Sequence, residues 1–234
     1  MNYYEYVSIP NNFEEYFQSL MRFEIFTVLT TISLLVLTVF IFIQIKLMRG
    51  IVLDVQVLHE CTKKGVGLPI EQAFEVINQE LDKAYPGWIN KNRKWILFNG
   101  GGAMGQMCVL HASLSEYLIF YGSPLYSQGH SGRYLMGVWD FMIQGETKTY
   151  FPGEFKPKVW PAGQYSYLPP YTAKGYCCEK ESYMVEYGRG VIPLALPYFL
   201  FSSIFVTLDI IPWLTACYRV GTQVVKNLLL NRKI

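Results

Sequence analysis

Side chains that are costly to bury recur inside the apolar and aromatic stretches of this chain. They are His111, Glu116, His130, Asp140 and Glu186. A carboxylate or an imidazole persists in apolar surroundings only when it is paired, hydrogen-bonded or protonated, and functional sites use such placements to shift pKa values. The pattern therefore predicts a site whose chemistry depends on carboxyl and imidazole groups, with proton transfer and metal binding as the two options.

The metal option is the weaker one. Two histidines and a carboxylate, drawn from His111, His130, Glu116 and Asp140, would suit non-haem iron. The chain has only three histidines, however, and none of them forms an H-x-D or H-x-E pair. A histidine satisfied by structural hydrogen bonds is the better interpretation of each, so we predict no metal.

The run Gly100–Gly105 matches the G-x-G-x-x-G pattern of dinucleotide-binding loops, and a strand-like segment at 95–98 precedes it. Such a loop also needs a parallel β-α-β setting and an acidic residue about 20 positions later. Glu116 comes too early, in a segment that we expect to be helical, and no repeated β-α-β pattern follows. We therefore predict no cofactor. Gly101 and Gly105, spaced as G-x-x-x-G, instead predict close backbone packing or a contact between chains.

The composition points to lipid rather than to nucleic acid. Hydrophobic residues make up 51% of the chain and charged residues only 16%. Soluble domains carry roughly 25% charged residues, so the excess apolar surface is expected to face lipid. The net charge of +2 is too small and too scattered for a nucleic-acid-binding protein. The five cysteines are odd in number and lack paired metal spacing, which predicts free thiols.

An N-terminal segment, residues 1–24, precedes an uncharged stretch at residues 25–45. A helix needs about 20 apolar residues to cross the hydrocarbon core, so this stretch predicts one transmembrane helix. A cleaved signal peptide is the alternative, but it would be followed by small residues, whereas Lys46 and Arg49 follow here. The basic residues after the stretch favour a cytosolic or matrix location for the C-terminal side.

Two regions with different sequence patterns follow the predicted transmembrane helix. Residues 50–94 show helical spacing of apolar side chains, with a Gly- and Pro-containing break at 65–69. From residue 95 to 192, short apolar and aromatic runs alternate with Gly and Pro, which predicts the strands of a small β-barrel or jelly roll. The segment 157–178, which contains several prolines, predicts a loop or edge structure.

The last region, residues 193–234, is apolar again. Residues 194–208 carry no charge but are too few to span a bilayer. Residues 214–230 contain Arg219 and Lys226 among Val and Leu, which is typical of an amphipathic helix lying in the membrane interface. A pair of core helices closing the barrel is an equally open interpretation, and both can hold.

Three ordered strings resemble one family closely. They are Asn99–Tyr117 (NGGGAMGQMCVLHASLSEY), GHSGRY at 129–134 and MVEYGRGVIP at 184–193. The chain is similar here to the fungal sterol C-8 isomerases and to the animal non-opioid intracellular sigma receptors. The resemblance covers residues 95–234 well, whereas in the anchor it is limited to the presence of one apolar N-terminal segment. It is imperfect at Ala103, where sigma receptors carry Trp, and in segment 157–183, which resembles neither branch and would cover the mouth of the barrel.

The resemblance implies a fold and a site. The fold would be α+β: one N-terminal transmembrane helix, a cupin-like β-barrel (jelly roll) without metal and flanked by helices, and a C-terminal pair of membrane-associated helices. By residue matching, Asp140 and Glu186 would face each other as the catalytic carboxylates in an apolar tunnel. The remaining implied residues are ligand-binding Tyr117, Met107, Ile119 and Leu196, with His130, Glu116 and His111 in supporting positions around them.

Moving a sterol double bond from C-8 to C-7 requires one proton to be delivered and another to be removed, through a tertiary carbocation. Two carboxyls in apolar surroundings cannot both ionise cheaply, so such a pair keeps one proton near neutral pH. Aromatic faces stabilise the cation. A protonated amine flanked by hydrophobic groups mimics that cation, so the same architecture can also bind amines.

Three functions therefore stay open at this point. The chain is a sterol C-8 isomerase, a sigma-type protein that binds hydrophobic amines without chemistry, or a catalytically silent subunit of a larger membrane assembly. A structural hydrogen-bonded role for Asp140 and Glu186 also stays open. The family implies the endoplasmic reticulum membrane and a homotrimer, whereas the inner mitochondrial membrane would suit an accessory subunit.

Overall fold

A computed structural model describes residues 11–231 of the chain. The chain divides between residues 45 and 46 into two compact units. The first is the greater part of helix α1 (Asn11–Arg49). The predicted boundary between residues 24 and 25 therefore falls inside one continuous helix, and residues 1–10 of the predicted N-terminal segment lie outside the described residues.

Helix α1 contains one stretch, Met21–Phe42, that is long and apolar enough to cross a membrane, with a mean hydropathy of 2.6. It overlaps the predicted span at 25–45. The hydroxyl groups within it donate back along the helix, as Thr31 does to the Thr27 carbonyl at 2.8 Å and Thr38 to the Leu34 carbonyl at 2.8 Å. Such bonds leave the helix surface apolar, because each hydroxyl is satisfied without water.

Two helices form in the region predicted to be helical, α2 (Val55–Lys63) and α3 (Ile70–Ala84). The Asp54 carboxylate caps α2 by accepting hydrogen bonds from the Gln56 and Val57 amides, as N-cap residues do. Leu58 on α2 and Ile77 on α3 are completely buried. Each buried side chain of this size stabilises the packing by about 1.5–3 kcal/mol.

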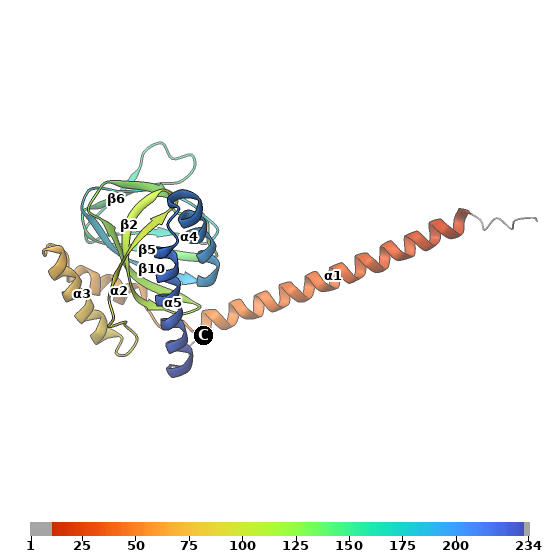
Figure 1. Cartoon of the computed structure of the whole chain (residues 1–234), viewed down its shortest axis with the longest axis horizontal. Coiled ribbons are helices and arrows are strands. Elements are labelled where there is room, and N and C mark those ends of the chain that lie inside the picture. Colours follow the sequence, from red (N-terminus) through yellow and green to blue (C-terminus); the bar gives the residue numbers. More distant parts are fainter. Residues whose placement is uncertain (1–10, 232–234) are drawn as a thin grey trace, which may run out of the picture. The chain divides into compact units, whose positions relative to one another are not determined.

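The rest of the second unit is a two-sheet jelly roll of antiparallel strand pairs (Figure 1). The large sheet has the order β1 (Trp95–Gly100), β2 (Ala103–Ala112), β3 (Glu116–Ser123), β10 (Ser182–Gly190), β5 (Met136–Gln144), β8 (Tyr165–Leu168). The small sheet has the order β4 (Ser127–His130), β9 (Gly175–Cys178), β6 (Glu146–Tyr150), β7 (Lys158–Pro161). The predicted α+β fold with a cupin-like jelly roll is confirmed.

Each face of the large sheet packs against a different set of apolar residues. One face packs against α2 and α3, burying Leu118, Phe120 and Tyr187. The other faces the small sheet, with Met107 and Tyr121 in one cluster with Cys178. Because neighbouring residues of a strand point to opposite faces, odd-numbered positions of β3 belong to the inner face and even-numbered positions to the helical face.

Two local expectations were wrong. Glu116 begins strand β3 rather than lying in a helix. Within segment 157–178, β7 and β8 are edge strands as expected, but β9 lies inside the small sheet, between β4 and β6. Main-chain hydrogen bonds to the neighbouring strands therefore stabilise a strand in a segment whose sequence shows no regular alternation of apolar and polar residues.

The glycine run forms a tight hairpin between β1 and β2. Gly100 pairs with Ala103, and both Gly101 (φ +59°) and Gly102 (φ +96°) have the positive φ of a type I′ turn. A Cβ on Gly101 would lie 2.2 Å from the His130 carbonyl oxygen, and one on Gly105 would lie 2.9 Å from the Gly122 carbonyl oxygen. These glycines therefore permit close packing within the chain, and their contact with a second chain stays a prediction.

The C-terminal region continues from β10 through a short 3-10 turn (Ile192–Ala195), α4 (Leu196–Ser202), a π-helical turn (Ser203–Thr207) and α5 (Ile211–Leu230). The predicted helix at 214–230 is confirmed. Figure 1 shows α4 and α5 beside the barrel and α2 and α3 along another side of it. The two helix pairs flank the jelly roll, as the resemblance implied.

Candidate functional site

A cavity lies inside the jelly roll, between the inner faces of its sheets and the residues that follow β10. Its volume is about 180 Å³. Its walls are mostly apolar and aromatic, and they include all six residues predicted as catalytic or ligand-binding. These are Met107, Tyr117, Ile119, Asp140, Glu186 and Leu196.

Asp140 and Glu186 are direct partners in the register of two neighbouring strands. Asp140 lies on β5 and Glu186 on β10, and the two residues pair across the antiparallel ladder. Side chains at paired positions share one face of a sheet and have Cβ atoms about 4.5–5.5 Å apart. Both carboxyl groups therefore reach the same cavity, although they lie 46 positions apart in the sequence.

Glu186 has one strong hydrogen-bond partner, Tyr117 on the adjacent strand β3. The Tyr117 hydroxyl donates to Glu186 Oε1 at 2.6 Å. Burial, followed by the charge of Asp140, raises the pKa of Glu186 to about 7, while the Tyr117 hydrogen bond and the charge of Lys174 oppose that rise. Near neutral pH the protonated and ionised forms of Glu186 are thus close in free energy, as general acid–base catalysis requires.

Asp140 has different partners. The Ser166 hydroxyl on β8 donates to Asp140 Oδ2 at 2.7 Å, and Lys174 Nζ donates to the same oxygen at 2.8 Å. Lys174 Nζ also donates to the Ser166 hydroxyl at 2.8 Å, and the Lys174 side chain is only 4% exposed. A buried ammonium of this kind is stable only when it is paired, so Asp140 and Lys174 hold each other in place.

Neither Lys174 nor Ser166 was predicted from the sequence. Both lie in segment 157–178, where we expected loop or edge structure and where the family resemblance is weak. The only available signal was a lysine between tyrosines, at Tyr171 and Tyr176. Such a lysine is normally interpreted as a solvated surface group, so this signal was too weak to use.

Tyrosine and phenylalanine rings complete the wall of the cavity. Tyr134 and Tyr198 meet edge to face, with their ring centroids 5.4 Å apart. Phe98 and Phe199 lie with their centroids 4.6 Å apart. Burial raises the pKa of Tyr198 to about 12, so its hydroxyl stays neutral at physiological pH. The wall therefore offers π-faces that attract a positive charge without carrying a negative one.

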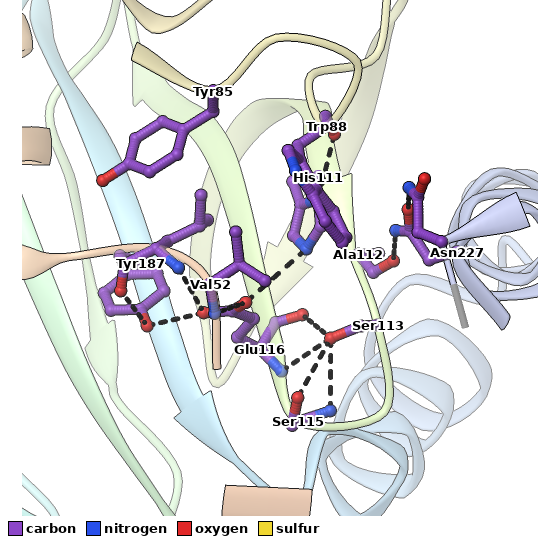
Figure 2. Close-up of polar contacts among 12 residues, drawn as sticks. Val52, Tyr85, Trp88, His111, Ala112, Ser113, Ser115, Glu116, Tyr187 and Asn227 are labelled. Carbon is purple, nitrogen blue, oxygen red and sulfur yellow. Dashed lines mark hydrogen bonds and ion pairs between the residues drawn. The ribbon is translucent and has the colours of Figure 1, made fainter. Parts of the chain in front are cut away.

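Glu116, predicted to support the site, is not among the residues that line the cavity, and Figure 2 shows its carboxylate beside Val52 and Tyr187. Its carboxylate accepts hydrogen bonds from the Val52 amide at 2.9 Å, the Leu53 amide at 3.3 Å and the Tyr187 hydroxyl at 2.8 Å. Glu116 and Tyr117 are neighbours on β3, so their side chains point in opposite directions. Glu116 thus fastens the segment before α2 to the sheet and does not reach the cavity.

The two histidines predicted to support the site are not among the residues that line the cavity either. His111 is completely buried, its Nδ1 lies 3.0 Å from the Trp88 carbonyl oxygen and its Nε2 lies 3.9 Å from Glu116 Oε1 (Figure 2). His130 is exposed at the end of β4, where its Nδ1 accepts a hydrogen bond from the Gly132 amide. Both imidazoles are engaged in local structure.

Two of the solved structures that match are distant likenesses. An RmlC-like cupin from Shewanella frigidimarina matches with a TM-score of 0.37 and 15% sequence identity, over 43% of this chain and 86% of that one. KdgF from a Halomonas species matches with a TM-score of 0.37 and 15% identity, over 44% of this chain and 93% of that one.

Curated sequences are much closer. "Protein erg2 homolog" of Dictyostelium discoideum is 66% identical over 234 residues, which is 100% of both chains. "C-8 sterol isomerase erg2" of Aspergillus fumigatus is 36% identical over 74% of each chain. "Sigma non-opioid intracellular receptor 1" of Taricha granulosa is 38% identical over 65% of this chain and 69% of its own. The family model "ERG2 and Sigma1 receptor like protein" matches residues 30–232, and the chain belongs to that family.

Proposed function

We propose that this protein is a sterol C-8 isomerase that moves a sterol double bond from C-8 to C-7. The observation that carries the proposal is the placement of Asp140 and Glu186, paired across β5 and β10 in a cavity that is otherwise mostly apolar and aromatic. A sterol is a neutral, apolar substrate, and its isomerisation needs an acid and a base in surroundings that exclude water.

In the proposed reaction Glu186 donates a proton to C-9 of the Δ8 sterol. The electron pair of the C-8/C-9 double bond forms the new C–H bond and leaves a tertiary carbocation at C-8. The Glu186 carboxylate left by that step then takes a proton from C-7, which regenerates the acid, and the electron pair of the broken C–H bond forms the C-7/C-8 double bond. One proton enters and one leaves, so the reaction needs no oxidant, reductant or cofactor.

The other groups of the cavity stabilise the intermediate. The Asp140 carboxylate lies across from the donor and provides a negative charge beside the cation. The rings of Tyr134, Tyr198 and Phe199 offer their π-faces, which attract a carbocation as they would an ammonium ion. Tyr117 holds the Glu186 carboxyl in one orientation through the 2.6 Å hydrogen bond.

The test is sterol profiling of a strain that lacks its own C-8 isomerase. Wild type should clear Δ8 sterols, and Glu186→Gln, which cannot transfer the proton, should not. Glu75→Gln is the matched control, because Glu75 lies exposed on α3, outside the cavity. Accumulation of Δ8 sterols with wild type, although the protein is expressed, would overturn the proposal. So would full clearance by Glu186→Gln.

A sigma-type role, amine binding without chemistry, is the second candidate. The same cavity favours it, because an ammonium flanked by hydrophobic groups fits a carboxyl pair surrounded by aromatic rings. Under this role wild type binds hydrophobic amines, Glu186→Gln binds them more weakly, and neither clears Δ8 sterols. An absence of amine binding by the purified wild type would remove this candidate.

We also propose that the protein is an integral protein of the endoplasmic reticulum membrane, with α5 lying in the interface. Five of the exposed apolar residues of α5 fall on one stripe, Ile211, Leu214, Tyr218, Val225 and Leu229, while the exposed Leu228 borders this stripe and Leu230 lies off it in the last turn. The buried Ala216, Gln223 and Asn227 lie on the opposite side of the helix. A photoreactive residue at position 229 should label lipid and one at 223 should not; equal labelling would contradict this placement.

A further inference from the structure

Lys174 is the one buried cation among the groups that line the described cavity. Its position is fixed from both ends. The Lys174 amide donates to the Ser131 hydroxyl at 2.9 Å, and its carbonyl accepts from the Ser131 amide at 3.0 Å. At the other end of the side chain, Nζ reaches Asp140 and Ser166. Contacts at both the main chain and the ammonium therefore hold the residue in the cavity wall.

Two charged side chains and one neutral hydroxyl act on the pKa of Glu186. Asp140 reaches it from β5 and Lys174 from the segment before β9, while β3 contributes the neutral hydroxyl of Tyr117. The other titratable groups of the cavity wall are Tyr121, Tyr134, Tyr176 and Tyr198, and burial raises the pKa of each. When Glu186 is protonated, the charges of Asp140 and Lys174 cancel and the cavity is neutral overall.

Two isolated carboxyls would behave differently. They would share one proton, carry one net negative charge, and titrate as a pair in which neither member owns the proton. Here the ammonium lies 2.8 Å from one oxygen of Asp140, whereas the hydrogen bond to Glu186 comes from the neutral hydroxyl of Tyr117. A charge-assisted bond favours the ionised form of its acceptor more strongly than a neutral donor does.

We propose that Lys174 is a positioning residue that keeps Asp140 ionised, so that Glu186 alone carries the exchangeable proton of the cavity. The inference rests on the proposed assignment of Asp140 and Glu186 as the reacting pair. It deepens that assignment by giving each carboxyl a separate role, with Glu186 as the acid and Asp140 as the fixed negative charge. It also makes the resting cavity neutral, which suits an uncharged lipid substrate.

Infrared difference spectra of the unliganded full-length protein in detergent test this division without any turnover. A protonated carboxyl has a C=O band that an ionised one lacks. Wild type should show the band below pH 7, and Glu186→Gln should lose it, because Asp140 stays ionised. In the double variant Glu186→Gln/Lys174→Met the band should return near neutral pH, because Asp140 is then buried without its cation and takes up a proton.

Lys180→Met is the matched control, since the Lys180 side chain is 73% exposed and lies outside the cavity. Added to Glu186→Gln, it should leave the band absent. A band that persists at pH 6 in Glu186→Gln would overturn the proposal, because Asp140 would then carry the proton, and so would a double variant with Lys174→Met that lacks the band. Sterol turnover is measured in a separate assay. Loss of the isomerase proposal and loss of the proposed role of Lys174 are therefore distinguishable.

Discussion

Asp140 and Glu186 are directly paired between β5 and β10, yet their carboxyl groups take different partners. Asp140 accepts from Ser166 and Lys174, and Glu186 accepts from Tyr117. Paired positions bring the two groups to one cavity, and burial together with the charge of Asp140 raises the pKa of Glu186 to about 7. Two carboxyl groups in different surroundings can take different roles, as the proposal for Glu186 and Asp140 requires.

Replacing Tyr117 by Phe should shift the pH profile of isomerisation to higher pH. The Tyr117 hydrogen bond lowers the pKa of Glu186, so its removal raises that pKa further above the ordinary value. The proposed acid is active when protonated, hence below a pH of about 7 in wild type. In Tyr117→Phe the fall in activity should therefore occur at a higher pH, as pH–rate measurements would reveal.

Tyr150→Phe is the control for that experiment, because Tyr150 is 52% exposed and lies outside the cavity wall. Its pH profile should match wild type. An unchanged profile in Tyr117→Phe, or a shift to lower pH, would contradict the acid role of Glu186.

Binding of a permanently charged amphiphile should depend on pH in wild type and much less in Lys174→Met. Trimethyl(4-phenylbutyl)ammonium is a suitable probe, because its own charge does not titrate. In wild type it pairs with Glu186 only after that group loses its proton. Its affinity should therefore fall about tenfold per pH unit below pH 7, as expected for one linked proton.

In Lys174→Met the two carboxyls share a proton and already carry one negative charge. Affinity should then stay within about threefold between pH 5.5 and 7, since no proton has to be released at the site. Calorimetry in buffers of different ionisation enthalpy measures both the affinity and the number of protons released. Equal pH slopes for wild type and Lys174→Met would contradict the role given to Lys174, and Lys180→Met should behave as wild type.

The sequence motifs predicted the residues that line the cavity more completely than the residues that hold these side chains in place. Two of the strings that carried the family resemblance contain Tyr117 and Glu186, Asp140 lies six positions after the third, and all three residues line the cavity. Lys174 was missed because its partner Asp140 lies 34 positions away, and only the pairing of β5 with β8 and of β9 with β4 and β6 brings the two segments together. Non-local pairing of this kind leaves no local period in the sequence.

Glu116 was misplaced for a different reason. Its supporting role was implied by the family resemblance, and its segment was interpreted as a helix, which gave no reason to separate its side chain from that of Tyr117. In a strand, neighbouring residues alternate between faces, so the assignment of Tyr117 to the cavity sends Glu116 to the helical side. Correct recognition of the strand would have been enough to separate the two roles. An acidic residue in an apolar run thus indicates a buried network before it indicates a catalytic site.

Replacing Glu116 by Gln should lower stability without changing the chemistry of the cavity. The Glu116 carboxylate accepts from two main-chain amides, at Val52 and Leu53, and from the Tyr187 hydroxyl. An amide side chain has one acceptor oxygen, so at least one of these donors is left unpaired, at a cost of about 1–3 kcal/mol. Thermal unfolding should show a lower midpoint, whereas Glu75→Gln should leave it unchanged.

The pH dependence of amphiphile binding separates this structural role from a role in the site. Glu116→Gln should keep the wild-type slope below pH 7, because Glu116 faces α2 and α3 and not the cavity. A changed slope would show that the outer network influences Glu186 through the sheet.

A double-mutant cycle on Asp140 and Lys174 should reveal strong coupling in stability. Asp140→Asn leaves the Lys174 ammonium buried without its counter-charge, and Lys174→Met leaves the buried Asp140 carboxyl without its cation, to share a proton with Glu186. Removing one partner of a buried ion pair costs about 3–5 kcal/mol, whereas replacing both can be nearly neutral. Asp140→Asn/Lys174→Met should therefore be more stable than either single variant, as denaturant unfolding would measure. If the two single losses in the free energy of unfolding simply added in the double variant, the two groups would not be coupled. The proposal that Lys174 keeps Asp140 ionised would then fail.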